Sequence, residues 1–235
     1  MNLKKSLLPV LAAAFMVASC NAQNKKTDIK MSSTIDSVSY GLGVAIGNNL
    51  KNSGFDSVKV DIMSQALKEV FEGKATMKQE DADKIIQGYM AEKEKMKGQE
   101  NVAKGKAFLE ENKKKAGVQT TASGMQYIVM KEGTGAKPGL NDKVTTHYHG
   151  TLIDGTVFDS SVERGQPASF PVSGVIPGWT EALQMMPVGS KWKLFLPSEL
   201  AYGERGAGGK IGPNSVLVFE VELLSIDAPD APQGK

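Results

Sequence analysis

Side chains that could act as nucleophiles or bind metals are few in this chain. Cys20 is its single cysteine, which excludes an internal disulfide, a zinc–thiolate cluster and the redox chemistry of a cysteine pair. His147 and His149 are the only histidines, and they would share one face of a strand because side chains alternate along it. No cysteine or other obvious third ligand lies near them in the sequence. We therefore predict no metal site and no cofactor.

The composition also argues against nucleotide or nucleic-acid binding. The run Gly203–Gly209 is rich in glycine, but no Gly-Lys-Ser follows it, so it does not match a phosphate-binding loop. Lysine and arginine (28) nearly balance aspartate and glutamate (26), which leaves a net charge of +2 and no basic excess for a nucleic-acid partner. The apolar fraction of 40% is typical of a folded globular protein.

The chain divides by composition into a helical and a strand-rich half. No proline occurs between Pro9 and Pro138, and proline-free sequence favours helices because proline removes an amide donor and clashes with the preceding turn. Most glycines and turn-forming dipeptides follow residue 120, which indicates strands and turns. The predicted fold class is α+β, with an all-α N-terminal domain before an antiparallel sheet.

The first residues are typical of an export signal. Two lysines precede the apolar run Leu7–Ala18, which is too short to span a membrane. The run ends at Val17–Cys20, which resembles the bacterial lipobox, where the cysteine becomes the lipidated first residue of the mature protein. The alternative is an ordinary export signal with an incidental cysteine. We expect a lipoprotein signal peptide over residues 1–19, lipidation at Cys20 and a flexible tether over residues 20–33.

Helical periodicity covers the segment from residue 34 to residue 118. Apolar residues recur at helical spacing from Thr34 to Leu50 and again from Asp61 to Phe71. Thr76 and Gln79 match a capping box, and residues 79–115 could then form one connecting helix of about 55 Å. Its glycines each cost about 1 kcal/mol relative to alanine, which argues against a rigid rod.

These helices cannot bury their apolar stripes alone. We therefore predict that residues 34–118 form a homodimerisation domain. The alternative is an intramolecular bundle packed on the other half. No catalytic group stands out in this segment, whose lysines and glutamates are typical of solvated helix faces.

The second half alternates apolar and polar residues in the manner of strands. The clearest segments are 125–131, 142–152, 191–196 and 215–225, separated by glycine, proline, asparagine and aspartate. One short helix, residues 179–186, could cross the sheet that they form. In the last strand the apolar residues share one face: Leu217, Phe219, Val221 and Leu223.

Five separated motifs in this half resemble the FKBP-type peptidyl-prolyl cis-trans isomerases in order and spacing. They are Thr146-His147-Tyr148-His149-Gly150, Gly155-Thr156-Val157-Phe158-Asp159-Ser160-Ser161, Val175-Ile176-Pro177-Gly178-Trp179, Leu200-Ala201-Tyr202-Gly203 and Val218-Phe219-Glu220-Val221-Glu222-Leu223. The helical half, together with the junction 117–127, resembles the macrophage infectivity potentiator branch. Members of that branch are exported dimeric isomerases with chaperone activity.

The resemblance implies an apolar pocket that holds a proline ring. Its floor would be Trp179, and its walls would be Tyr148, Phe158, Val175, Ile176 and Phe219. The Ile176 amide and the Tyr202 hydroxyl would bind substrate carbonyls, Asp159 would lie beside the twisted amide, and Ile211 would contact the rim. Without the motifs, the aromatic residues would be interpreted as ordinary core.

Two positions depart from the family pattern. Ala168 stands where many members carry an aromatic residue, so that wall should be more open. Ala207 replaces a histidine found in some members, which changes the rim contact there. Neither position belongs to the predicted floor.

Taken together, the sequence predicts an FKBP-like domain over residues 119–227 and a C-terminal tail over residues 228–235. The expected function is isomerisation of X-Pro bonds in unfolded or partly folded exported proteins, with chaperone activity, by a homodimer. The expected location is the bacterial cell envelope, with a lipid anchor on the periplasmic side or in the outer membrane. One alternative is a non-catalytic dimeric holdase that binds proline-containing segments, and another is a structural surface lipoprotein whose isomerase fold is vestigial.

Overall fold

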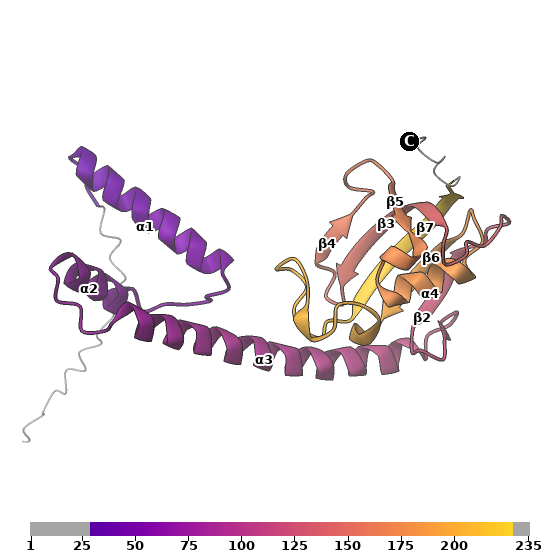
Figure 1. Ribbon diagram of the computed structural model, residues 1–235, viewed down its shortest axis with the longest axis horizontal. Coiled ribbons are helices and arrows are strands. Elements are labelled where there is room, and N and C mark those ends of the chain that lie inside the picture. The colour runs from indigo at the N-terminus through magenta and orange to yellow at the C-terminus, as the bar shows by residue number, and fades with distance from the viewer. Residues whose placement is uncertain (1–28, 228–235) are drawn as a thin grey trace, which may run out of the picture. The chain divides into compact units, whose positions relative to one another are not determined.

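The computed structural model of the protein describes residues 29–227. The predicted signal peptide, the lipidation site at Cys20 and the tail 228–235 lie outside the described residues. The chain forms two compact units whose boundary in the sequence falls between Thr76 and Met77. Figure 1 shows the elements of each unit.

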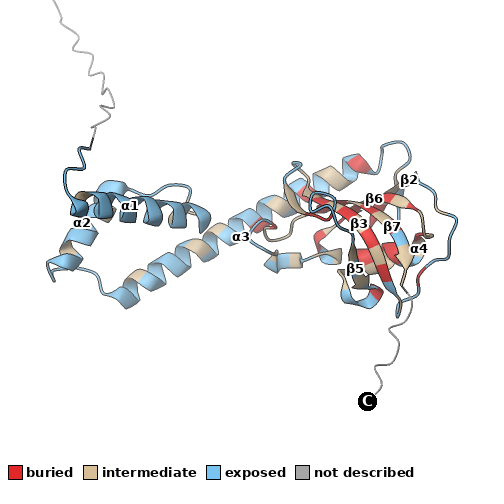
Figure 2. Ribbon diagram, turned by 90° about the horizontal axis from the view of Figure 1, so that it is seen from above, coloured by how far each residue is buried: buried red, intermediate tan, exposed pale blue. Residues whose placement is uncertain are grey.

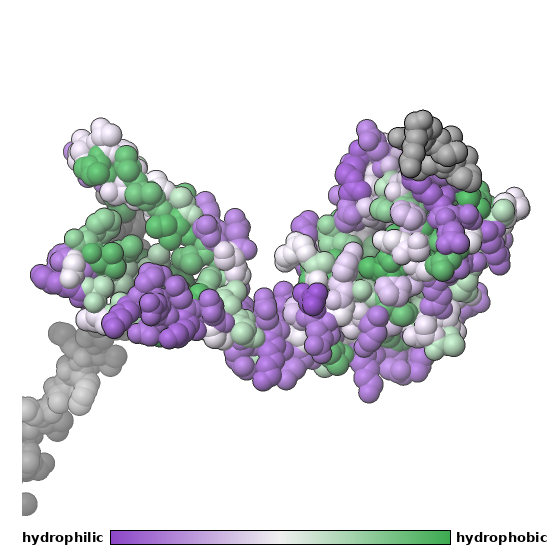
Figure 3. All heavy atoms as spheres, viewed as in Figure 1, coloured by the Kyte–Doolittle hydropathy of each residue, from purple (hydrophilic) through white to green (hydrophobic). Residues whose placement is uncertain are grey.

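The first unit consists of two helices, α1 (Thr34–Asn52) and α2 (Val60–Phe71). A capping box starts α1: the Ser33 hydroxyl accepts the Asp36 amide at 3.1 Å, and the Asp36 carboxylate accepts the Ser33 amide at 2.9 Å. Neither helix has a buried residue, and both are mostly pale blue in Figure 2. Apolar side chains gather over both helices in Figure 3. This unit therefore has apolar stripes without a core of its own.

The second unit begins with α3 (Gln79–Asn112), the single long helix that the sequence predicts. Lys78 is its N-cap residue and makes no side-chain cap hydrogen bond, so the predicted capping box with Thr76 is wrong. Within residues 29–227, no helix combines the length and apolar character needed to cross a membrane.

An antiparallel sheet follows α3, as predicted. Its strands are β1 (Gln119–Thr120), β2 (Gln126–Lys131), β3 (Lys143–Leu152), β4 (Val157–Ser160), β5 (Ala168–Pro171), β6 (Lys191–Leu196) and β7 (Leu217–Ile226). The order is β1-β2-β6-β7-β3-β4, and β5 pairs with β3 beside β4. The sequence predicted the four long strands. It missed β1, β4 and β5, which are too short to show alternation.

The core lies between this sheet and helix α4 (Pro177–Met185), which crosses one sheet face in Figure 1. Leu217, Phe219, Val221 and Leu223 are all buried, which confirms the predicted face of β7. Gly178 lets α4 approach closely, because a Cβ there would lie 2.6 Å from a Leu196 methyl carbon. Three 3₁₀ turns complete the unit: η1 (Val172–Gly174), η2 (Ser198–Leu200) and η3 (Gly203–Arg205).

We expect the unit's stability to depend on this core. Leu194 on β6 is 1% exposed, so Leu194→Ala should lower the free energy of unfolding by about 2–5 kcal/mol. Leu140→Ala is the matched control, because that side chain is 49% exposed and its loss should change stability by less than about 0.5 kcal/mol. Urea titration followed by tryptophan fluorescence measures both, and equal losses would contradict the assignment of the core.

Candidate active site

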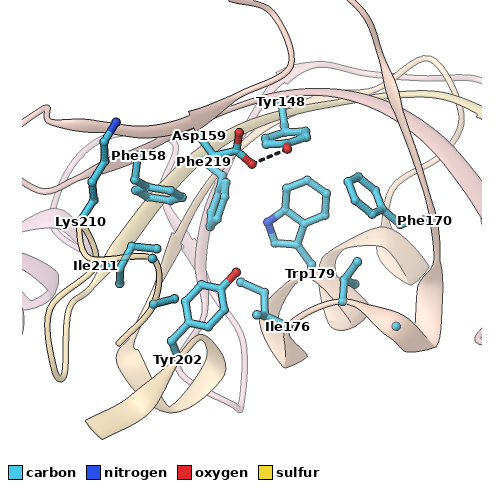
Figure 4. Close-up of a pocket in the computed structure, with 14 residues that line it drawn as sticks. Tyr148, Phe158, Asp159, Phe170, Ile176, Trp179, Tyr202, Lys210, Ile211 and Phe219 are labelled. Carbon is cyan, nitrogen blue, oxygen red and sulfur yellow. Dashed lines mark hydrogen bonds between the residues drawn. The ribbon is translucent and has the colours of Figure 1, made fainter. Parts of the chain in front are cut away.

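A cavity of ≈ 660 Å³ opens where α4 faces β3, β4 and β7 (Figure 4). It brings together all nine predicted site residues: Tyr148, Phe158, Asp159, Val175, Ile176, Trp179, Tyr202, Ile211 and Phe219. Five more residues line it that the sequence analysis did not assign to the site: Phe170, Gly174, Ala207, Gly208 and Lys210.

The floor of the cavity is the indole of Trp179, which is 5% exposed. Tyr148 and Phe219 meet it edge-to-face, each with ring centroids 5.3 Å away, and Phe170 does so at 5.9 Å. Phe158 packs against Phe219 in the same manner at 5.4 Å. Each ring is held by its neighbours, so the position of the indole is fixed.

Two residues that line the cavity, Ile176 and Tyr202, carry hydrogen-bond donors. Pro177 starts α4, where its missing amide costs nothing, and Ile176 before it is extended. The Ile176 carbonyl accepts the Trp179 amide at 2.9 Å, whereas the Ile176 amide has no partner in the described chain. Tyr202 precedes η3, and Figure 4 shows its hydroxyl pointing into the cavity. Both donors can therefore bind a carbonyl group.

Asp159 lies on the rim in a hydrogen-bonded cluster. Antiparallel pairing of β3 with β4 places it near Tyr148, whose hydroxyl donates to Asp159 Oδ2 at 2.5 Å. Arg164 donates to Asp159 Oδ1 and, at 2.8 Å, to the Tyr148 hydroxyl. The sequence analysis missed Arg164. The available signal was its position five residues after Asp159, in the turn that follows β4.

The cluster fixes the protonation states of its members. Burial opposes ionisation of Asp159, but hydrogen bonds from Tyr148 and Arg164 and the charge of Arg164 outweigh it and lower the pKa of the carboxyl group. Burial, and then the bond to Asp159, raise the pKa of the Tyr148 phenol. At neutral pH the carboxylate is therefore charged and paired, and the phenol keeps its proton.

The two departures from the family pattern fall in different places. Ala168 packs against the core and does not line the cavity. Phe170, on the same face of β5, supplies an aromatic ring to that wall. Ala207 lines the cavity, and its backbone exchanges hydrogen bonds of 2.8 and 3.0 Å with Ile211.

The two histidines lie outside the cavity. Nδ1 of His147 is 3.1 Å from the Ser161 hydroxyl, and Nδ1 of His149 is 3.0 Å from the Ser160 hydroxyl. Tyr148 between them faces the core, as strand alternation requires. These contacts join β3 to the end of β4 and to the turn after it.

Comparison with family models covers nearly all of the described chain. Residues 134–224 match the model described as FKBP-type peptidyl-prolyl cis-trans isomerase. Residues 35–129 match the model described as the domain amino terminal to FKBP-type peptidyl-prolyl isomerase.

Individual proteins are similar over comparable lengths. The outer membrane protein MIP of Legionella longbeachae is 43% identical over 234 residues, which cover 96% of this chain and 97% of that protein. The FKBP-type 22 kDa peptidyl-prolyl cis-trans isomerase of Escherichia coli is 50% identical over 192 residues, covering 80% and 93%. The crystal structure of FkpA from Escherichia coli superposes with a TM-score of 0.65 at 37% identity, covering 84% and 98%.

We expect Arg164→Ala to raise the pKa of Asp159 towards its ordinary value near 3.8, because the carboxylate loses the hydrogen bond and the positive charge of Arg164. A lowered folded-state pKa stabilises the protein above pH 3.8, and this contribution is lost as the pH falls through the lowered value. The variant should therefore be less stable than the parent at pH 7. At a pH below the lowered pKa of Asp159 in the parent, the two proteins should be equally stable.

Carboxyl NMR titration and urea unfolding at both pH values measure these two effects. Arg164→Lys should give an intermediate pKa, and Lys137→Ala, in an exposed loop, should leave it unchanged. A pKa of Asp159 unmoved in Arg164→Ala would show that the cluster does not control the carboxylate.

Proposed function

Because this chain belongs to the FKBP-type peptidyl-prolyl cis-trans isomerases, we propose that the cavity over Trp179 is where it rotates X-Pro bonds, and that its substrates are exported proteins in the course of folding. Uncatalysed rotation takes tens to hundreds of seconds, which can limit folding. The edge-to-face packing of three rings around Trp179 is the observation that carries the placement of the site.

The mechanism needs no covalent step. Amide resonance sets a rotational barrier of about 18–20 kcal/mol, and the twisted amide has lost its charge separation. An apolar, water-poor surface that accepts the twisted form better than the planar form therefore lowers the barrier. In this proposal the proline ring lies on Trp179, with Phe158, Phe219 and Val175 as walls.

The hydrogen-bond donors on the rim orient the substrate. The unpaired Ile176 amide and the Tyr202 hydroxyl are placed to bind carbonyl groups on either side of the rotating bond. Asp159 lies beside that bond, with its charge balanced by Arg164, and Ile211 contacts the substrate at the rim. Neither donor gives up its proton, so these contacts hold the chain without chemical exchange.

We infer that the helical segment 34–118 forms a homodimer that also gives the enzyme chaperone activity. The support is energetic, because α1 and α2 expose apolar side chains and have no buried residue. A dimer that covers these stripes would hold two isomerase domains, which we place at residues 119–227. Two pockets on one particle could retain an unfolded client between rounds of rotation.

The location follows from the N-terminal sequence. We propose export to the bacterial cell envelope and lipid anchoring through Cys20, with residues 20–33 as the tether. The Legionella longbeachae relative is described as an outer membrane protein, which supports this placement.

Replacement of Trp179 tests the site. Trp179→Leu should lower kcat/KM for a short X-Pro peptide by about tenfold or more, because each loss of about 1.4 kcal/mol in transition-state binding is a factor of about ten. Trp192→Leu is the matched control: this second tryptophan is equally buried, stacks on Tyr127 and does not line the cavity. It should preserve turnover per folded molecule.

A protease-free assay of cis-to-trans relaxation measures both rates. Equal losses in the two variants would mean that the pocket is wrongly placed. No acceleration by the unmodified chain would instead leave the holdase alternative, in which proline-containing segments bind without turnover.

The dimer is tested on α1. Leu42→Lys with Ile46→Lys puts two charges on its apolar stripe, where the side chains are 59% and 36% exposed, and should convert the dimer to monomers. Ser37→Lys with Asn48→Lys adds the same charge to the opposite side of the helix and should leave the dimer intact. Light scattering gives the masses, and a monomeric unmodified chain would contradict the proposal.

A further inference from the structure

The second half of α3 carries a contact surface made mostly of glycine and asparagine. The only residues buried in α3 are Gly98, Gly105 and Asn112, which are seven apart and therefore lie on one face of the helix. Asn101 and Phe108 repeat on the same face at the intervening positions. We name these five residues the α3 seam. At four of these five positions, glycine or asparagine stands where a packing face usually has an apolar residue.

The glycines of the seam bring the helix backbone against the segment that precedes β7. A Cβ on Gly105 would lie 2.6 Å from a methyl carbon of Val216, a distance that real contacts do not reach. A Cβ on Gly98 would lie 3.2 Å from Cβ of Pro213. Close approach is therefore the physical reason for glycine at these two positions.

Asn101 makes the polar contact of the seam. Its Nδ2 donates to the Pro213 carbonyl at 2.7 Å and to the Ser215 hydroxyl at 3.3 Å. The Ser215 hydroxyl in turn donates to the Gly212 carbonyl at 2.8 Å. Asn214, between the two contacts, is the one non-glycine residue with positive φ (55°) in the described chain. Asn101 thus binds the loop on both sides of Asn214, the residue whose backbone is strained.

This loop reaches the cavity. We call residues 203–216 the flap. The Asn214 amide donates to the Gly203 carbonyl at 2.8 Å, directly after Tyr202. The backbone pair of Ala207 and Ile211 closes the inner part of the flap, and both residues line the cavity. A continuous path of hydrogen bonds and backbone therefore connects Asn101 to the residues of the cavity rim.

Hydrogen bonds at the C-terminal end of the seam fix the register of α3 against the sheet. Asn112 Nδ2 donates to Gln126 Oε1 at 2.9 Å, and Gln126 Nε2 donates to the Leu109 carbonyl at 2.9 Å. Asn112 is 1% and Gln126 4% exposed, so a shift in register would leave buried amides unpaired. The Phe108 ring packs on Phe195 of β6 beside them, with centroids 6.0 Å apart.

We propose that the α3 seam is the support of the active-site flap, and that Asn101 is a positioning residue for prolyl isomerisation. Asn101 touches no substrate. It acts through Pro213 and Asn214, which fix the flap and with it Tyr202 and Ile211 on the cavity rim.

Asn101→Asp tests this role in the full chain. The substitution keeps the size of the side chain but replaces the amide donor with a carboxylate oxygen that faces the Pro213 carbonyl, so the shorter of the two hydrogen bonds between α3 and the flap is lost. We expect kcat/KM for a short X-Pro peptide to fall about three- to tenfold, the range that one lost hydrogen bond gives. Gln99→Ala removes an exposed amide from the same turn of α3 and should leave kcat/KM unchanged.

NMR separates positioning from general destabilisation. The backbone amide signals of Ala207 and Ile211 should shift or broaden in Asn101→Asp, while those of β6 should stay in place. Wild-type kcat/KM with unchanged flap signals would overturn the proposal, and so would a loss of activity accompanied by shifts throughout the sheet.

A compensating pair provides an independent test. Gly105→Ala forces a methyl group against Val216 and should lower kcat/KM by a similar factor. Val216→Ala removes the clashing methyl, and the remaining Cβ lies 3.7 Å from the new one, which is an ordinary contact. The double variant should therefore recover most of the lost activity. A double variant no more active than Gly105→Ala would show that helix and flap are not coupled through this contact.

Discussion

The edge-to-face packing around Trp179 is the interaction on which the rest of this structure depends. Rotation about an amide needs no reagent, only a surface that fits the twisted form and excludes water. Such a surface works only when it does not relax onto the planar form, and the rings of Tyr148, Phe170 and Phe219 hold the indole from different sides. The sheet and α4 together hold those rings.

Charge is present at this site, but it is balanced at the rim. Arg164 pairs with Asp159 and also donates to the Tyr148 hydroxyl, so the carboxylate does not place an uncompensated charge over the apolar floor. Tyr148 belongs to both parts, because its ring packs on Trp179 and its hydroxyl binds Asp159. The position of the floor and the charge balance of the rim are therefore set by one side chain.

The sequence predicted the features that rest on long alternating patterns or on family motifs. Alternation over β7 gave its buried face, and the family resemblance gave nine residues, eight of them within the five motifs, that the structure places on one cavity. Short strands such as β4 and β5 carry too few residues for alternation to register. Arg164 was missed because its ion pair depends on the path of the turn after β4, which spacing alone does not determine.

The glycines of α3 show why local propensity was misleading. Counted by helix propensity, Gly98 and Gly105 are weak points, each about 1 kcal/mol worse than alanine. In the folded chain they are the positions where a side chain would collide with the flap. Helix propensity measures only the free-energy cost of glycine within the helix. The stabilising contact is with residues more than a hundred positions away in the sequence. The sequence of the helix alone therefore does not reveal it.

The two halves of α3 therefore differ in what surrounds their side chains. From Gln79 to Met96 the helix exposes large apolar side chains, Ile85 and Ile86 among them. From Gly98 onward it is fixed in register by buried amides. Our proposed domain limit at residue 118 follows composition and leaves the seam with the helical segment, although its contacts are with the sheet domain. Because the seam holds the flap, the residues that position the active site extend in sequence to residue 98.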